Sequence, residues 1–272
     1  MSDGVRFLPS SDQTLMVYFG ESITLEAHER VVKFLRLVER EPVAAVRNLH
    51  PGYCSVLVKF DALACSHAEL EAILRGYLVQ LETVKVEAAR LVEIPVCYGG
   101  EFGPDMTEVC ELHGLTSEEV VERHCGVEYL VYFLGFVPGF AYLGRAGDLG
   151  MEEGAGPISR RGTGKTALLR GKAGLKDSRP FVPKGKLGVQ GIPFTSRLVT
   201  PRKKVPVGSV GIAGEQTGVY PFATPGGWRL IGRTPMKMFR AAEARSALAI
   251  GDRVRFVAIS AARFTEMEAG AS

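Results

Sequence analysis

Hydrophobic residues in the first sixty positions follow two different spacings. The unbroken apolar run at residues 15–19 ends at a glycine and predicts a β-strand. Within residues 25–39 the apolar positions recur every three or four residues, which predicts an amphipathic helix. Two further runs, residues 43–49 and 54–60, flank a Pro51-Gly52 turn and predict a β-hairpin. The start of the chain therefore indicates a mixed α and β unit.

A second helix is predicted by a capping pattern. Ser66 is followed three residues later by Glu69, and an apolar face from Leu70 to Leu81 comes directly after them. A serine and a glutamate at this spacing can each accept a free backbone N–H of the first helical turn. With residues 84–94 expected to be extended, the predicted order over the first ninety residues is βαββα.

The pattern changes beyond a predicted break at Ile94-Pro95. Residues 106–113 and 117–124 have the spacing of two short helices, and we expect Ser117 to be the N-cap of the second. From there on, short β-rich runs are separated by Gly/Pro turns, which favours a barrel or sandwich over a parallel α/β sheet. The runs are Tyr129–Phe133, Ser209–Ala213, Trp228–Ile231 and Arg253–Ile259.

Composition excludes several classes of protein. The 272 residues are 46% hydrophobic and 23% charged, which is ordinary for a globular chain and unlike a disordered one. No window approaches the roughly 18 apolar residues that a membrane span needs. Neither end of the sequence carries a signal peptide or an anchoring signal, so we predict a cytoplasmic protein. The five cysteines form no C-x-x-C pair, so we expect reduced thiols and no metal site.

Positive charge is concentrated in one Gly-rich stretch. Residues 145–204 contain 14 Lys and Arg against 4 Asp and Glu. Only Phe181 and Phe194 interrupt this stretch as aromatics, so nucleic-acid binding by base stacking is not expected. Residues 161–166 resemble the end of a phosphate-binding P-loop, but Ser159 stands where the motif requires glycine and no strand precedes it. The stretch therefore predicts a basic loop.

A glycine-aromatic motif at residues 133–144 is the first candidate for a binding site. It contains three glycines, one proline and four aromatic residues. Glycine permits close approach to the backbone, and aromatic side chains can form the wall of an apolar cleft. A structural bulge with its aromatics in the core is the alternative. The residues expected to line the cleft are Phe136, Pro138, Gly139, Phe140 and Tyr142.

Two Gly-rich segments, residues 214–220 and 224–235, combine hydroxyl, amide and guanidinium groups. Such loops suit a carboxylate or phosphate, because arginine offers a two-pronged donor and loop N–H groups can surround an anion. Arg233 is the leading candidate anion binder. Trp228, the only tryptophan, fits a barrel core and a ligand wall equally well.

His124 is a candidate acid or base, with Glu101 and Asp105 upstream to orient it or to activate water. The sequence does not show that these side chains meet. The alternative is a histidine that caps its helix or forms an ordinary surface group.

These residues together resemble a known family. It is described as the B-type subunit of 5-oxoprolinase, as allophanate hydrolase subunit 1 and as the sporulation-kinase inhibitor, and also as a carboxyltransferase subdomain C/D. The resemblance covers most of the chain. It runs through Arg6–Pro9, Glu93–Asp105, His124, Phe133–Gly144, Thr200–Arg202, Val205–Gly214, Gln216–Tyr220, Thr224–Trp228, Leu230–Pro235 and Gly251-Asp252.

The resemblance implies an α+β fold with two domains. A small α/β N-terminal domain at residues 1–92 would be followed by a cyclophilin-like β-barrel domain at residues 93–272, with the basic Gly-rich stretch as an insertion at about 145–199. Members have a short connection there. The Pro-Arg step that usually precedes the Thr-Pro-Arg run is Ser196-Arg197 in this chain.

The resemblance also implies a hydrolase subunit. It would belong to an ATP-dependent 5-oxoprolinase, which opens 5-oxoproline to L-glutamate. The subunit would act with a homologous C-type partner subunit and a third component, and it would be inactive without the partner. ATP, with its accompanying Mg²⁺, is expected to bind with the partner's help. Two alternatives remain open: the carboxyltransferase component of a biotin-dependent urea carboxylase and allophanate pathway, and a non-enzymatic inhibitor that binds a histidine kinase.

On the oxoprolinase hypothesis the candidate residues take specific roles. His124 and Glu101 would transfer protons, and no protein metal site is expected. The other polar and loop residues would hold the substrate or its phosphate. They are Arg202, Gln216, Thr217, Tyr220, Pro225, Gly226, Gly227 and Arg233.

Overall fold

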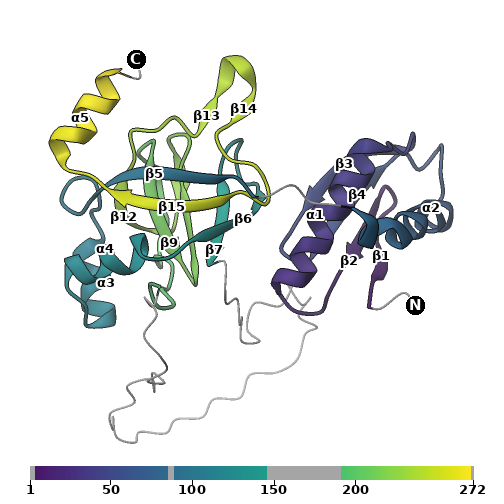
Figure 1. Cartoon of the computed structure of the whole chain (residues 1–272), viewed down its shortest axis with the longest axis horizontal. Helices are drawn as coiled ribbons and strands as arrows, with labels where there is room; N and C mark the ends of the chain where they lie inside the picture. The colour runs from purple at the N-terminus through teal and green to yellow at the C-terminus, as the bar shows by residue number, and fades with distance from the viewer. Residues whose placement is uncertain (1–3, 85–88, 146–190, 271–272) are drawn as a thin grey trace, which may run out of the picture.

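The computed structural model describes residues 4–84, 89–145 and 191–270, which form two units side by side (Figure 1). The N-terminal unit pairs a four-stranded antiparallel sheet, in the order β1-β2-β4-β3, with two helices. A 3₁₀ turn at Leu81–Thr83 ends it. Its elements are β1 (Arg6–Ser11), β2 (Thr14–Tyr18), α1 (Leu25–Arg40), β3 (Val46–Pro51), β4 (Ser55–Phe60) and α2 (His67–Gln80).

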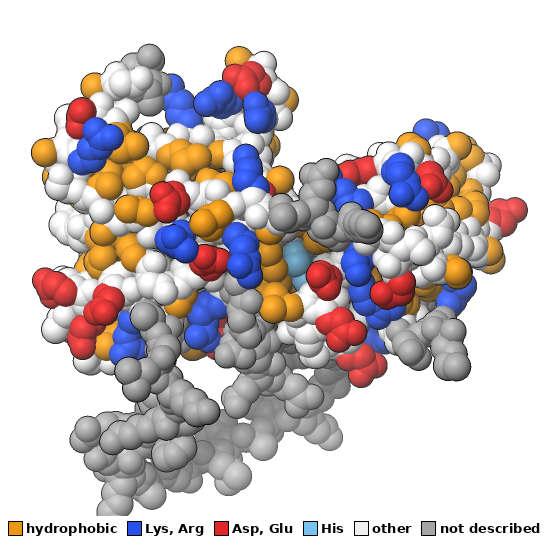
Figure 2. Space-filling view, in the orientation of Figure 1, with side chains coloured by type: hydrophobic (Ala, Val, Ile, Leu, Met, Phe, Trp, Pro, Cys, Tyr) orange, Lys and Arg blue, Asp and Glu red, His pale blue; other side chains and the backbone are white. Residues whose placement is uncertain are grey.

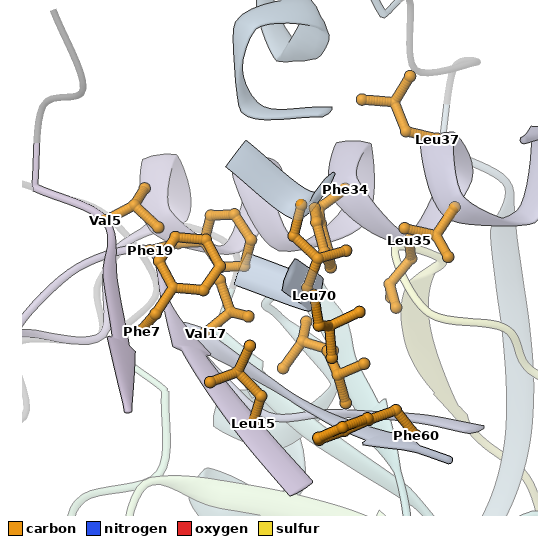
Figure 3. Packing of buried hydrophobic residues seen from close by; sticks show 14 of the residues in the cluster. Val5, Phe7, Leu15, Val17, Phe19, Phe34, Leu35, Leu37, Phe60 and Leu70 are labelled. Atoms are coloured by element: carbon orange, nitrogen blue, oxygen red, sulfur yellow. The ribbon is translucent and has the colours of Figure 1, made fainter. Parts of the chain in front are cut away.

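The core of the N-terminal unit lies between its sheet and its helices. Burial alternates along β2, where Leu15 and Val17 are fully enclosed, and along β4, so one face of the sheet is apolar. Helix α1 contributes Phe34 and α2 contributes Leu70 to the same cluster (Figure 3). Two layers thus bury one continuous core.

Most of the predicted N-terminal elements are present. The capping box is confirmed, because Ser66 accepts the Glu69 backbone N–H while the Glu69 carboxylate accepts that of Ser66. The predicted order lacks one strand: β1 precedes β2 and pairs with it. Only Phe7 of β1 is buried, so this edge strand has no hydrophobic alternation by which to predict it.

The second unit is a closed barrel with the strand order β10-β7-β6-β15-β5-β12-β9. All neighbours are antiparallel except β15 and β5, which run parallel. Two small sheets, β11-β8 and β13-β14, and a 3₁₀ turn at Ala241–Glu243 complete the unit. The strands are β5 (Leu91–Tyr98), β6 (Tyr129–Leu134), β7 (Ala141–Arg145), β8 (Arg202–Val205), β9 (Ser209–Ala213), β10 (Gln216–Val219), β11 (Thr224–Gly226), β12 (Arg229–Arg233), β13 (Phe239–Arg240), β14 (Arg245–Ser246) and β15 (Arg253–Ala258).

Three helices pack against the barrel strands. They are α3 (Met106–His113) on β12, α4 (Ser117–Cys125) on β15 and α5 (Ala261–Gly270) on β5. The predicted N-cap of α4 is wrong by one residue. Thr116, not Ser117, is the cap, because Thr116 and Glu119 form a reciprocal capping box and Ser117 is already helical. The sequence did not predict α5, which buries a single side chain, Phe264.

The expected α+β class is confirmed by this arrangement of an α/β unit and a barrel. Strand β5 begins at Leu91, so the predicted domain boundary between residues 92 and 93 falls inside the first barrel strand. Within the described ranges, no helix has the length and apolar character to cross a membrane.

Substituting Gly103 by alanine is expected to destabilise the barrel strongly. A methyl group there would fall on the backbone carbonyl of Ile231, which cannot move without disturbing β12. We expect a loss of about 1–3 kcal/mol in unfolding free energy, because overpacking forces backbone shifts. Urea denaturation measures this loss. Gly76→Ala is the matched control: this helical glycine is exposed with open space around it, so the same change should stabilise by roughly 0.5–1 kcal/mol. Equal effects of the two substitutions would contradict the packing argument.

Candidate functional site

Four aromatic side chains from three segments form a continuous cluster on the barrel, called here the aromatic wall: Phe140, Tyr142, Tyr220 and Trp228. The Phe140 ring is central, with centroids 5.0 Å from Tyr142, 5.2 Å from Tyr220 and 5.4 Å from Trp228. Three of the four were predicted as cleft or substrate residues. The structure therefore brings the glycine-aromatic motif together with the two Gly-rich segments.

The loop before Phe140 is partly at the surface. Phe136 is 59% exposed with a positive φ of 67°, and its ring meets Phe140 at 5.6 Å. Pro138 is exposed as well, whereas Gly139 is buried with a φ of 81° and no space for a side chain beside Phe239. Of the five predicted cleft residues, Phe136 and Pro138 thus lie at the rim.

The Pro225-Gly226-Gly227 loop lies against Tyr220. A Cβ atom at Gly226 would come within 2.8 Å of the Tyr220 ring, so glycine is what permits this contact. Burial raises the pKa of Tyr220, although a backbone hydrogen bond from Trp228 partly opposes that effect. Tyr220 therefore keeps its proton at neutral pH and remains a potential donor.

Arg202 is anchored on one side only. Its Nη2 donates to Oδ1 of Asp105 at 2.5 Å, and Oδ2 of Asp105 accepts the backbone N–H of Leu230 at 2.6 Å. The register of β8 and β11 places Arg202 opposite Gly226. Its Nη1 atom is buried and has no hydrogen-bond partner. The buried carboxylate holds the guanidinium in place while leaving one nitrogen available.

Arg197, which the sequence did not single out as a site residue, is held between two backbone anchors. The carbonyl oxygen of Ser196 accepts a hydrogen bond from Nε of Arg229 at 2.9 Å. The N–H of Leu198 donates to the carbonyl oxygen of Gly227 at 2.8 Å. The backbone on both sides of Arg197 is therefore fixed to the barrel.

The side chain of Arg197 extends over the aromatic wall. Its guanidinium carbon lies 5.8 Å from the Trp228 ring centroid, within the range of a cation–π contact. Burial raises the pKa values of Tyr53, Tyr142 and Tyr220, and the positive charge of Arg197 partly offsets the rise in all three. Arg197 therefore lies among several phenol groups.

Tyr53, which also went unpredicted, brings the N-terminal unit to the site. Nε2 of Gln216 donates to the Tyr53 hydroxyl. The Tyr53 ring meets Tyr132 at 5.3 Å and Phe133 edge-on at 4.8 Å. Tyr53 lies between β3 and β4, so a hairpin of one unit borders the aromatic residues of the other. Only the aromatic character of that turn could have suggested the contact.

His124 is fully buried and forms a chain of hydrogen bonds. Nδ1 lies 2.7 Å from the Tyr98 hydroxyl, and Nε2 lies 2.9 Å from Oγ1 of Thr217, which donates to the carbonyl oxygen of Gly211 at 3.1 Å. Both ring nitrogens therefore face hydroxyl groups, each of which can donate or accept. Burial lowers the pKa of His124 to about 3, so the ring is neutral at physiological pH.

The structure does not bring Glu101 to His124. Glu101 is exposed, whereas both nitrogens of His124 bond to other groups. Arg233 comes five residues after Trp228, and at about 3.3 Å per residue this is roughly 16 Å of extended chain. Its guanidinium lies 5.3 Å from the Phe102 ring and 5.0 Å from the Phe264 ring. Arg233 and Glu101 instead share the neighbourhood of Cys97, whose pKa burial raises.

A groove of about 970 Å³ lies between α5 and the β13–β14 hairpin. Figure 2 shows it as the hollow between the two projections of the barrel, with hydrophobic side chains along its floor. None of the sequence-predicted site residues lines this groove. Three of the predicted residues lie instead on the aromatic wall, whereas Glu101 and Arg233 lie near Cys97.

A protein site made of three or more ligands would hold a metal without a nucleotide. Among the described residues, no three His, Cys, Asp or Glu side chains lie close enough together to hold a metal ion. The P-loop-like residues 161–166, and the basic insertion apart from its ends, lie outside the described ranges.

The barrel and its flanking α/β unit form a fold that also occurs in larger solved proteins. The crystal structure of Kluyveromyces lactis urea carboxylase superposes with a TM-score of 0.65 over 96% of this chain and 22% of its own, at 15% identity, which shows the shared fold alone. The crystal structure of TTHA0988 superposes with a TM-score of 0.66 and 28% identity over 91% of this chain. The present chain spans only 40% of TTHA0988.

The chain belongs to the family described as carboxyltransferase domain, subdomain C and D, whose sequence model matches residues 5–152 and 188–249. The middle of the basic insertion, residues 153–187, lies outside the match. Two relatives are named as the B-type subunit of 5-oxoprolinase. The Bacillus subtilis (strain 168) protein is 36% identical over 92% of this chain and 90% of its own length, and the Escherichia coli O157:H7 protein is 40% identical over 86% and 87%.

Proposed function

We propose that this chain is a subunit of an ATP-dependent 5-oxoprolinase, which converts 5-oxoproline to L-glutamate. The observation that carries the proposal is the similarity to three proteins named as the B-type subunit of 5-oxoprolinase, at 36–40% identity over 86–93% of this chain. Their name indicates a complex. We propose a homologous C-type subunit and a third component as the partners, and inactivity of this chain alone.

The chemistry explains why such an assembly needs ATP. A lactam resists water because resonance stabilises its amide bond, and phosphorylation of the amide oxygen would make the carbonyl carbon a better electrophile. Attack of one water molecule on that carbon would then open the ring and release phosphate and L-glutamate, so the site must hold an anion and admit this water. The free nitrogen of Arg202 suits the binding of the anion.

His124 is best suited to a positioning role. A neutral, fully enclosed imidazole with both nitrogens bonded cannot reach a substrate proton without rearrangement. Its bond to Thr217 fixes β10, and the neighbouring Gln216 in turn reaches Tyr53. Glu101 stays a proposed proton-transfer residue, but it lies near Cys97 and Arg233 and no contact joins it to the aromatic wall within the described residues.

ATP is proposed to bind in the assembled complex, with Mg²⁺ carried on its phosphates or held by a partner. The described residues support no metal ligand set of their own. Nucleotide binding by this chain alone is therefore not part of the proposal.

Carboxyl transfer from carboxybiotin to urea is the second candidate, because the matching family is described as a carboxyltransferase domain. Competing substrates separate the two functions. The assembled complex should release glutamate from 5-oxoproline with ATP and leave urea untouched in the presence of carboxybiotin. Consumption of urea without glutamate release would reverse the order of the two candidates.

A further inference from the structure

The geometry points to a carboxylate-binding subsite in which Arg197 and Arg202, both near Tyr220, hold the carboxylate of a small cyclic amide against the aromatic wall. This inference rests on the proposed function, because 5-oxoproline is a flat lactam ring that carries one carboxylate. It assigns a substrate-binding role to Arg197, a residue that neither the family match nor the relatives' names identify.

Both arginines are tied to the same glycine loop. Arg202 lies opposite Gly226 in the β8–β11 pair. The segment of Arg197 is joined to Gly227 by the hydrogen bond from Leu198. Gly226 also contacts the Tyr220 ring, so one short loop fixes two cations relative to one phenol. The charges of both arginines act on Tyr220, in agreement with this placement.

The two guanidinium groups retain donors that protein groups do not use. Among the described residues, Arg197 has no carboxylate partner. Arg202 is paired with Asp105 through Nη2, and its buried Nη1 lacks a partner. A buried donor without an acceptor is unfavourable, and a ligand carboxylate would satisfy it. Arginine is suited to this because its planar fork matches the two oxygens of a carboxylate.

The surrounding side chains match the rest of such a ligand. Tyr142, whose ring stacks on Phe133, keeps part of its surface exposed and offers apolar contact to a flat ring, whereas Trp228 is only 5% exposed and lies beneath Arg197. The backbone anchors on both sides of Arg197 reduce the conformational entropy that this segment loses when a ligand binds. The subsite is thus preorganised for a small, planar anion.

Trp228 provides a direct reporter, since the chain has a single tryptophan and Arg197 lies over its ring. We would titrate the full chain, alone and in the assembled complex, with 5-oxoproline and with 2-pyrrolidone, which has the same lactam ring without the carboxylate. Fluorescence and calorimetry would be recorded for the wild type, Arg197→Gln and Arg197→Lys. Arg36→Gln, an exposed surface arginine in α1, is the matched control.

The wild type should bind 5-oxoproline saturably and 2-pyrrolidone at least tenfold more weakly. Arg197→Gln should weaken 5-oxoproline binding roughly 10- to 100-fold, the range for losing a charge-assisted hydrogen-bonded pair. Arg197→Lys should bind 5-oxoproline with an affinity between those of the wild type and Arg197→Gln, since it keeps the charge and loses the planar fork. Arg36→Gln should match the wild type.

Any of three results would overturn the subsite: equal binding of both ligands, unchanged binding by Arg197→Gln, or no binding of 5-oxoproline by the wild-type complex. Turnover measured in parallel separates the two proposals. A complex that releases glutamate with an unchanged KM in Arg197→Gln would preserve the proposed function and remove the subsite. Arg197-dependent carboxylate binding without any turnover would preserve the subsite and remove the oxoprolinase function.

Discussion

Lowering the pH from 7 to 5 should remove about 4 kcal/mol from the free energy of unfolding through two buried histidines, about 2 kcal/mol each. Burial lowers the pKa of His124 to about 3 and that of His28 to about 4. In the unfolded chain both rings bind a proton near pH 6.5, so only the unfolded state gains protons in this range. This contribution to the free energy of unfolding is complete above pH 6.5, and it is lost as the pH falls toward the folded-state pKa values of the two histidines.

Urea denaturation at several pH values measures this effect. His28→Gln and His124→Gln should each lose about half of the pH dependence between pH 7 and 5, whatever they do to absolute stability. His50→Gln changes an exposed histidine and should retain the full slope. A slope unaffected by the buried substitutions would contradict the neutral, enclosed state of these rings.

Asp105→Ala should cost about 3–5 kcal/mol in unfolding free energy, because removing one partner of a buried ion pair leaves the other uncompensated. The Asp105 side chain is 7% exposed and bonds both Arg202 and the backbone of Leu230. The guanidinium of Arg202 would also lose its anchor, so the assembled enzyme should lose activity even where the variant remains folded. Thermal or chemical denaturation gives the first quantity and glutamate release gives the second.

Glu266→Ala is the control for Asp105→Ala. Glu266 pairs with Arg263 on the surface of α5, where both side chains are more than half exposed. Such pairs contribute little because solvent screens them. A comparable loss from both substitutions would show that the Asp105 pair has no special structural role.

Local features of the sequence predicted the local structure well. The Ser66–Glu69 box fixed the start of α2, and apolar runs marked β2, β4 and β9. These features succeed because their stabilising contacts lie within a few residues of one another. The many short strands between glycine turns predicted a barrel or a sandwich, and the family resemblance implied the barrel; neither predicted the parallel β5–β15 pair.

The site was harder to predict because it depends on contacts between distant residues. His124 and Thr217 are 93 positions apart, and Gln216 and Tyr53 are 163 apart. Spacing carries no information on such pairs, so Glu101 was matched with a histidine that it does not contact. Arg197 was missed because an arginine at the end of a basic stretch has the same composition signal as its solvated neighbours.

Glutamate and phosphate release from 5-oxoproline and ATP tests the proposed function most directly. The assay would use this chain alone, with its homologous partner subunit, and with both remaining components. Release should be stoichiometric and occur in the complete mixture only, and omitting this chain should abolish it. Full activity without this chain, or a stable complete complex with no release, would contradict the proposed function.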